Sequence, residues 1–373
     1  MFDFGSDVKN GEMDLGGWSL DSPRHFDDQD SNEGFYKRLK NFADIKVRET
    51  LTEIPDTDPQ AYEKHEEITK KYRSATGGDQ GVPASYYYIV PLFSEFFVES
   101  NPIPPANSIQ IELVHNVPQF YLNVGGKMTE ADATARGYHI QVTSCKIRMR
   151  TRQLVAEKMY EIQNILAKNR PDKILYRTNR LTTTRLFVSP GQVNFLDDTL
   201  PAVKVMPSRI YVMVLEAIRY QGRYKLNPYN FRTGFDFKAN ATDVVPYQND
   251  ITNMTITVAG QTFGCTSHDT NLCRMTELYE IYQSHGRSYQ TESRFVLTRE
   301  QFMNGSYIVC FDMTLDARSW DGSTLHSCRQ GQIKLEIGFK LPLQQGLQVL
   351  MVNQYASGFT LDKMHKAADI EYR

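Results

Sequence analysis

The chain has 373 residues, 40% of them hydrophobic and 12% aromatic, with 21 Tyr and 20 Phe but only 2 Trp. This is long enough for two domains of ordinary size, each with its own core. The formal net charge of −2 excludes a whole-molecule field that would attract nucleic acid or an anionic membrane, although local charged patches stay open. A Tyr-rich composition favours strands and interfaces, because the ring buries area while the hydroxyl keeps a polar partner.

The cysteines are odd in number and scattered, which predicts free thiols in a reducing compartment; they are Cys145, Cys265, Cys273, Cys310 and Cys328. The chain opens on the polar, acidic sequence MFDFGSD, so no signal peptide is visible, and no apolar run is long enough to span a bilayer. We therefore expect a soluble intracellular protein, in which the sequons at Asn240, Asn253 and Asn304 are chance matches.

Residues 1–83 contain little that could form a strand. Gly, Asp and Ser dominate as far as Asn32, and a short helix is predicted from Phe35 to Phe42. Residues 62–73 are helix-like but lack an apolar stripe. We expect this segment to be rich in loops and poorly structured.

Residues 84–170 predict about half of a β-sandwich followed by a helix. Four strands are expected, at 86–93, 108–115, 120–124 and 138–150, and the second alternates strictly between apolar and polar residues. Leu154 to Lys168 carries an apolar stripe and stops before Pro171, which predicts a connector helix.

Residues 171–362 predict a complete β-sandwich of Greek-key type, and residues 363–373 a polar tail. The unbroken apolar run 210–215 fits a strand that is covered on both faces. It is followed by Gly222 and by the rigid turn Asn227-Pro-Tyr-Asn-Phe231. A helix is predicted at 272–285, and further strands at 174–186, 254–259, 293–297, 307–315, 332–341 and 348–354, with short pieces near Phe235 and Phe359.

Metal binding has one candidate, the set Cys265, His268 and Cys273. The spacing is irregular and no fourth ligand is near unless Asp269 serves, so buried thiols beside a turn are favoured over zinc. We predict no metal and no cofactor.

Candidate catalytic residues are as sparse. No G-x-S-x-G sequence and no Gly-rich phosphate loop occurs. His115 and His139 are interpreted as rim or core histidines. Asp312, inside an apolar strand, needs a partner if it is buried, and we expect a turn to supply one, in a structural role. We predict that the protein is not an enzyme and has no catalytic residue.

Four cations, Lys146, Arg148, Arg150 and Arg152, fall on alternate positions of a predicted strand and would form a row on one sheet face. Such a row could contact nucleic acid or an acidic partner subunit. It could equally be a solvated outer face or the rim of a subunit interface, which is the simpler interpretation.

Residues 171–362, which we call the second block, contain a spaced series of residues that resembles one family: Pro207, Arg209, Gly222, Asn227, Pro228, Asn230, Phe231, Arg299, Phe302, Gly305, Phe311, Asp312, Thr314 and Gly331. The series is similar to the double jelly-roll capsid-like proteins of Polinton/Maverick-type self-synthesising DNA transposons and related viruses. Met313 and Leu315 depart mildly from the family pattern. Family members carry a further strand-rich segment at the N-terminus, so the resemblance implies an N-terminally truncated chain with an incomplete first jelly roll.

The resemblance implies a mainly β double jelly-roll fold with a connector helix, and a structural, hexon-like capsid role without catalysis. It also implies homotrimers that meet neighbouring capsomers, contact with a minor capsid protein, and a place in the virion, the cytoplasm or the nucleus. A non-catalytic β-sandwich that binds carbohydrate or protein is the alternative, because composition alone allows it.

Overall fold

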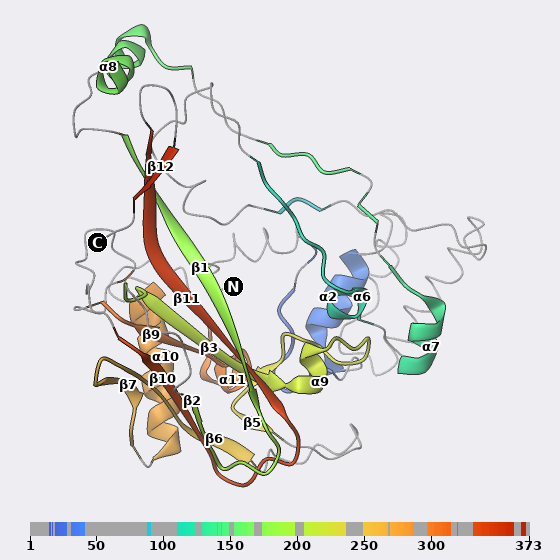
Figure 1. The fold of residues 1–373 in the computed structure, drawn as a ribbon. Helices are drawn as coiled ribbons and strands as arrows, with labels where there is room; N and C mark the ends of the chain where they lie inside the picture. Colours follow the sequence, from blue (N-terminus) through green and yellow to red (C-terminus); the bar gives the residue numbers. More distant parts are fainter. Residues whose placement is uncertain are drawn as a thin grey trace, which may run out of the picture.

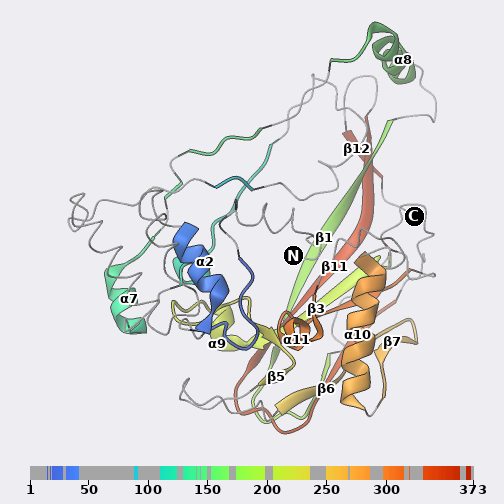
Figure 2. The ribbon, with the colours of Figure 1, turned by 180° about the vertical axis from the view of Figure 1, so that it is seen from behind.

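The computed structural model describes a little under three fifths of the chain (Figures 1 and 2). The described residues are 15, 17, 19–27, 31–41, 88–90, 110–123, 129–139, 141–142, 144–148, 153–167, 174–197, 205–235, 249–267, 269–285, 297–314, 319, 331–361 and 367–370.

Two antiparallel sheets form a β-sandwich. The first has the order β1-β11-β3-β9, and the second has the order β2-β10-β6-β5, with β7 also paired to β6. Strands β1, β2 and β3 alternate between the sheets, and so do β9, β10 and β11, whereas β5, β6 and β7 all lie in the second sheet, where β6 and β7 form a hairpin. Four strands in each sheet, β1, β11, β3 and β9 facing β2, β10, β6 and β7, therefore have the connectivity of a jelly roll. The bounds are β1 Ile174–Val188, β2 Asn194–Asp197, β3 Arg209–Glu216, β5 Gly234–Phe235, β6 Asn249–Val258, β7 Gln261–Cys265, β9 Ile308–Asp312, β10 Ile333–Phe339 and β11 Leu347–Leu361.

The core lies between the two sheets. Alternate residues of β3 enter it, because Ile210, Val212 and Val214 are fully buried in one hydrophobic cluster with Ile256 of β6 and Leu335 of β10. The other residues of β3 face the opposite side and form a second, smaller cluster with Phe231. Both faces of β3 are thus covered, as its unbroken apolar sequence predicts.

The two lateral sides of the sandwich differ. On one side, helix α10 (Thr270–His285) packs against β9, β6 and β7 and contributes Leu278 and Ile281 to the core (Figure 2). On the other side, β1 and β2 are edge strands, since each pairs with one strand only in the described part, β11 or β10. Within the described residues, one side is closed by a helix, whereas the strands on the other side, β1 and β2, have unpaired outer edges.

The outer face of the first sheet is covered by the segment 217–232, which we call the elbow. It contains the short helix α9 (Ala217–Tyr220) and strand β4 (Phe231–Arg232), which pairs with β8 (Asn304–Gly305) just after helix α11 (Arg299–Met303). Phe231, Tyr220 and Tyr229 of the elbow pack on Leu215 and Ile308. Beyond the sandwich, β1 and β11 continue as a long ribbon, on which β12 (Ala367–Ile370) pairs (Figure 1).

The mainly β fold is confirmed, and so are most of the strands predicted in the second block and three of the predicted helices. Strands form at β1, β3, β5, β6, β9, β10 and β11, and helices form at α2 (Glu33–Asn41), α8 (Ala156–Ala167) and α10. The predicted strand at 293–297 lies outside the described residues except for Leu297. Strands β2, β7 and β12 were not predicted.

The strands predicted in residues 84–170, which we call the first block, do not form over the residues described there. Residues 88–90, 110–117 and 138–148 carry no strand where they are described, and Pro118–Tyr121 is a short helix, α6. Leu113 and Val114 are 65% and 85% exposed, so the alternating sequence has no sheet to cover it. An alternating sequence becomes a strand only when a partner supplies the other half of the hydrogen-bond ladder. The division of the chain at 83/84 and 170/171 stays a prediction.

Candidate functional site

The elbow is the point at which distant parts of the chain meet. Its turn is set locally: the Asn227 side chain accepts a hydrogen bond from the backbone N–H of Tyr229 (2.9 Å), and Pro228 restricts the backbone between them. Gly222 has a φ of +83°, a conformation that side-chain-bearing residues rarely adopt. The local sequence therefore makes the elbow rigid, and the elbow's buried polar groups are held in place for contacts with other segments.

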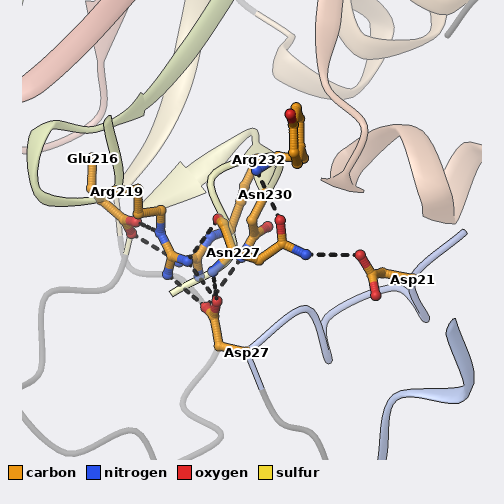
Figure 3. Close-up of polar contacts among 8 residues, drawn as sticks. Asp21, Asp27, Glu216, Arg219, Asn227, Asn230 and Arg232 are labelled. Atoms are coloured by element: carbon orange, nitrogen blue, oxygen red, sulfur yellow. Dashed lines mark hydrogen bonds and ion pairs between the residues drawn. The ribbon is translucent and has the colours of Figure 1, made fainter. Parts of the chain in front are cut away.

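A carboxylate from the N-terminal arm, by which we mean residues 19–27 and 31–41, binds this surface (Figure 3). Asp27 accepts two hydrogen bonds from the Arg219 guanidinium (2.7 and 2.6 Å), one from the backbone N–H of Asn227 (2.8 Å) and one from the Asn230 side chain (3.3 Å). Burial opposes ionisation of Asp27, but the charges of Arg219 and Arg232 and these hydrogen bonds outweigh it and lower its pKa. Asp27 is therefore held as an anion.

Glu216 balances the remaining positive charge. It forms ion pairs with Arg219 and with Arg232 (2.8 Å to the latter), and all three side chains are at most 10% exposed. Because each buried charge faces an opposite one, the cluster avoids the cost of an isolated buried ion.

A second arm carboxylate binds the same turn from the other side. Asp21 accepts a hydrogen bond from the Asn227 side chain (2.8 Å), from Asn32 (2.8 Å) and from Arg38 of α2 (2.6 Å). Asn32 in turn accepts hydrogen bonds from the backbone N–H groups of Ser22 (3.1 Å) and Phe35 (3.3 Å). The predicted short helix α2 is part of the arm and has a definite role, since its Arg38 helps to hold Asp21 against the elbow.

Phe26 completes the arm's contact. It is 4% exposed and its ring lies against Gly305 of β8, where a Cβ atom would overlap it. Gly305 also has a φ of +146°, so both its backbone and its lack of a side chain are used here.

Two further elements reach the elbow from the first block. Glu130, in the first turn of α7 (Glu130–Arg136), accepts hydrogen bonds from the backbone N–H groups of Tyr224 and Lys225, both 3.0 Å. The Tyr138 ring meets the Tyr224 ring edge to face at 6.2 Å, and Phe120 of α6 meets Tyr229 at 5.8 Å. The elbow is accordingly the junction between the jelly roll and the preceding residues.

Most of the residues that carry the family resemblance lie at the elbow or in the adjoining core. Gly222, Asn227, Pro228, Asn230 and Phe231 form the elbow, Gly305 receives Phe26, and Phe302 and Phe311 are buried in the core. Pro207 is buried ahead of β3, Arg299 is exposed at the start of α11, and Gly331 lies against Ala259.

The remaining resemblance residues, Arg209, Asp312 and Thr314, belong to a second polar cluster at the end of β3 and β9. Asp312 accepts hydrogen bonds from the backbone N–H and hydroxyl of Thr314 and from those of Ser319, between 2.5 and 3.1 Å. The prediction that a turn satisfies Asp312 is confirmed. Arg209 donates to Ser319 and to the carbonyl oxygen of Ser284 (2.6 Å).

This second cluster also contains neighbouring side chains of the types that catalytic sites use: Tyr211, His285, Ser284 and Cys310. His285 lies 2.7 Å from the Tyr211 hydroxyl, but burial and the charge of Arg209 lower its pKa to about 3. Burial raises the pKa of the Cys310 thiol to about 12. Near neutral pH the imidazole is therefore neutral and the thiol protonated, and neither is tuned for acid–base or nucleophilic work.

The row of cations is placed only in part. Lys146 and Arg148 are exposed and lie in a segment without strand structure, while Arg150 and Arg152 lie outside the described residues. The strand on which the row was predicted is therefore absent at Lys146 and Arg148. His139 is exposed and close to the backbone of Gly137, and His115 is exposed.

The expectation of free thiols is wrong for two of the five cysteines. Cys265, the last residue of β7, forms a disulfide with Cys273 in the first turn of α10, with Cα atoms 5.2 Å apart. The same two cysteines belong to the zinc candidate, and sulfur atoms that are joined in a disulfide are not available as thiolate ligands for zinc. His268 and Cys328 lie outside the described residues, and Cys145 and Cys310 are free.

Within the described ranges, no group of three or more His, Cys, Asp or Glu side chains is arranged to hold a metal ion. Among the same residues, no helix has the length and apolar composition to cross a membrane.

The fold and these two clusters define a mainly β jelly-roll protein with a polar junction to the residues that precede it. No protein-family model and no curated protein matches the sequence. Among solved structures, the chain is similar to the cryo-EM structure of the Sputnik virophage (TM-score 0.33, 12% identity, 55% of this chain and 40% of that one). It is also similar to the mavirus major capsid protein (0.32, 10%, 54% and 42%) and to the PBCV-1 virus capsid (0.30, 10%, 54% and 53%). The chain thus spans about half or less of the length of these structures.

Proposed function

We propose that this chain is a non-catalytic shell subunit, a hexon-like capsid protein of a transposon- or virus-derived element, which assembles with copies of itself. The observation that carries the proposal is a jelly roll with one side closed by α10. Among the described residues, β1 and β2 on the opposite side, which we call the bare side, pair along one edge only. A shell subunit needs a rigid body with self-complementary surfaces rather than a cleft.

The bare side has the composition of an interface. Phe187 at the end of β1 is 56% exposed, Val193 in the following connection is 40% exposed, and Leu196 of β2 is 63% exposed. Exposed apolar side chains of this kind, on the edge strands of both sheets, mark surfaces that associate. An open strand edge beside them adds unpaired backbone groups that a neighbouring subunit could satisfy.

The proposal includes the finer expectations that the family resemblance implies. The subunit forms homotrimers that contact neighbouring capsomers and a minor capsid protein, and residues 84–170 belong to a first jelly roll that is completed in the assembly. The elbow supports this arrangement, because Glu130 and the rings of Tyr138 and Phe120 hold the first block against it. Lys146 and Arg148, being exposed, are available to nucleic acid or to a subunit contact.

Sedimentation velocity of the full chain tests the self-association. We expect a species of three times the mass of one chain, and loss of that species in Leu196→Asp, because an aspartate would be buried without a partner at the interface. Leu272→Asp is the matched control, since Leu272 is 53% exposed on α10, on the other side of the sandwich. A folded wild-type monomer at all concentrations would contradict the proposal, and saturable glycan binding by that monomer would favour a binding module instead.

A further inference from the structure

The disulfide between Cys265 and Cys273 connects two elements that differ in how firmly they are held. In the part of the chain that the structure describes, β7 pairs along one edge only, with β6, and Gln261 and Thr262 at its start are exposed. α10 is anchored in the core through Leu278 and Ile281. The disulfide therefore ties an edge strand to a buried helix at the side of the sandwich that α10 closes.

The turn between the two cysteines is organised without the disulfide. Asp269 accepts hydrogen bonds from the backbone N–H groups of Asn271 and Leu272 (2.9 and 3.4 Å), and its own carbonyl oxygen accepts one from Cys273 (3.1 Å). These contacts cap α10 and fix Cys273 in its first turn. The helix can thus keep its place whether or not the sulfur atoms are joined.

We propose that this disulfide is a reversible modification site at which a small thiol of the glutathione class adds to Cys265. The two cysteines differ in exposure, because Cys273 is fully buried whereas Cys265 is partly exposed at the end of β7. Thiol–disulfide exchange needs an approach to the sulfur under attack, so access selects Cys265.

The exchange is balanced in two steps. A thiolate bonds to the Cys265 sulfur, the Cys265–Cys273 bond breaks, and Cys273 leaves as a thiolate that takes a proton from water. A second small thiolate then bonds to the sulfur of the first one, which gives a small-molecule disulfide and leaves Cys265 as a thiol. The protein pair gains two electrons and two protons, and two small thiols are oxidised. The reverse reaction, with the oxidised small molecule, restores the disulfide.

The consequence is local release of β7. Without the disulfide, β7 keeps its ladder to β6 but loses its covalent tie to α10, so its amide groups should open more often. Gly264, beside Cys265, has a φ of +102° and leaves no room for a side chain against Met254 and Phe311. The end of β7 thus packs closely against β6 and β9, and the disulfide adds a covalent tie to α10.

Mass spectrometry of the full chain tests the site. Peptides of the alkylated, non-reduced protein should contain the Cys265–Cys273 link, and brief treatment with glutathione followed by acid quenching should give an adduct on Cys265 and none on Cys273. Two single variants compare the access to each cysteine when the disulfide is absent. With glutathione disulfide, Cys265 in Cys273→Ser should react about tenfold or more faster than Cys273 in Cys265→Ser. Free Cys310, which is fully buried, is the internal control for an unreactive thiol.

Hydrogen exchange tests the release. On reduction, the amides of residues 261–265 should exchange about tenfold faster while those of β10 stay unchanged. An adduct on Cys273, equal reactivity in the two variants, or unlinked cysteines in the non-reduced protein would overturn the site. Unchanged exchange in β7 would overturn its release.

Discussion

Asp27 accepts a hydrogen bond of 2.8 Å from the backbone N–H of Asn227, which lies 200 residues further along the chain. The same carboxylate accepts hydrogen bonds from both terminal nitrogens of Arg219. One acidic side chain of the N-terminal arm therefore joins the arm to the elbow, and through the elbow to β3 and the core of the jelly roll. The polar cluster is a structural junction, and the following changes test it.

Asp27→Asn should detach the arm without unfolding the sandwich. The neutral amide cannot form an ion pair with the Arg219 guanidinium, and the cost to arm docking should be about 2–3 kcal/mol, at the lower end for a buried pair because Asp27 is 23% exposed. Limited proteolysis should cut the arm of the variant faster than that of the wild type. Glu33→Gln on the exposed face of α2 is the control and should leave the rate unchanged, since its ion pair with Lys37 is solvent-exposed.

Acid should detach the arm in the same way. The pKa of Asp27 is lower in the folded protein than in the unfolded chain, where it is about 3.9. The stabilisation is therefore complete above that value and is lost as pH falls through the lower, folded pKa. Arm amides followed by hydrogen exchange should lose protection below about pH 4, and this loss should be absent from Asp27→Asn, whose arm is unprotected at every pH. A transition near pH 6 would point to a histidine instead.

Gly305→Ala should be more damaging than Gly260→Ala. Both glycines have positive φ, +146° and +81°, so both variants incur backbone strain of about 1 kcal/mol or more. A Cβ at Gly305 also overlaps the Phe26 ring, whereas one at Gly260 meets no atom within 4 Å. Urea unfolding and arm proteolysis should both be altered in Gly305→Ala, and equal effects at the two positions would contradict the packing of Phe26 on β8.

Asp312→Ala should destabilise the end of β9. It would leave the backbone N–H groups of Thr314 and Ser319 and their hydroxyls without an acceptor, at a cost of about 2–4 kcal/mol in the free energy of unfolding. Asp312→Asn should lie between wild type and alanine, because one oxygen remains. If the alanine variant were as stable as wild type, the turn at 312–319 would not depend on this carboxylate.

The strands of the jelly roll could be predicted where their own sequence carries the pattern. The run at 210–215 is apolar on both faces, and it became β3, covered by the core on one face and by the elbow on the other. β2 and β7 could not be found in this way, because Asn194–Asp197 and Gln261–Cys265 are short and have few apolar residues. Their pairing with β10 and β6 defines them, and that is a long-range property.

The junction was out of reach of local sequence reasoning for the same reason. The turn at Asn227-Pro228 could be predicted as rigid, but its partners Asp21 and Asp27 lie about 200 residues away, in a segment expected to be loop-rich. The disulfide was missed because scattered cysteines were assigned to a reducing compartment, and sequence spacing alone does not give the 5.2 Å Cα separation of Cys265 and Cys273. Conversely, the alternation at 108–115 predicts a strand, but residues 110–115 carry no strand and have no partner among the described residues.

The central claim is that this jelly roll is a subunit that builds a shell with copies of itself. Electron microscopy of the concentrated full chain tests it most directly. We expect threefold particles with a pseudo-hexagonal outline, or closed assemblies of them. Single asymmetric particles of one chain each, at concentrations where the protein is folded, would contradict the account.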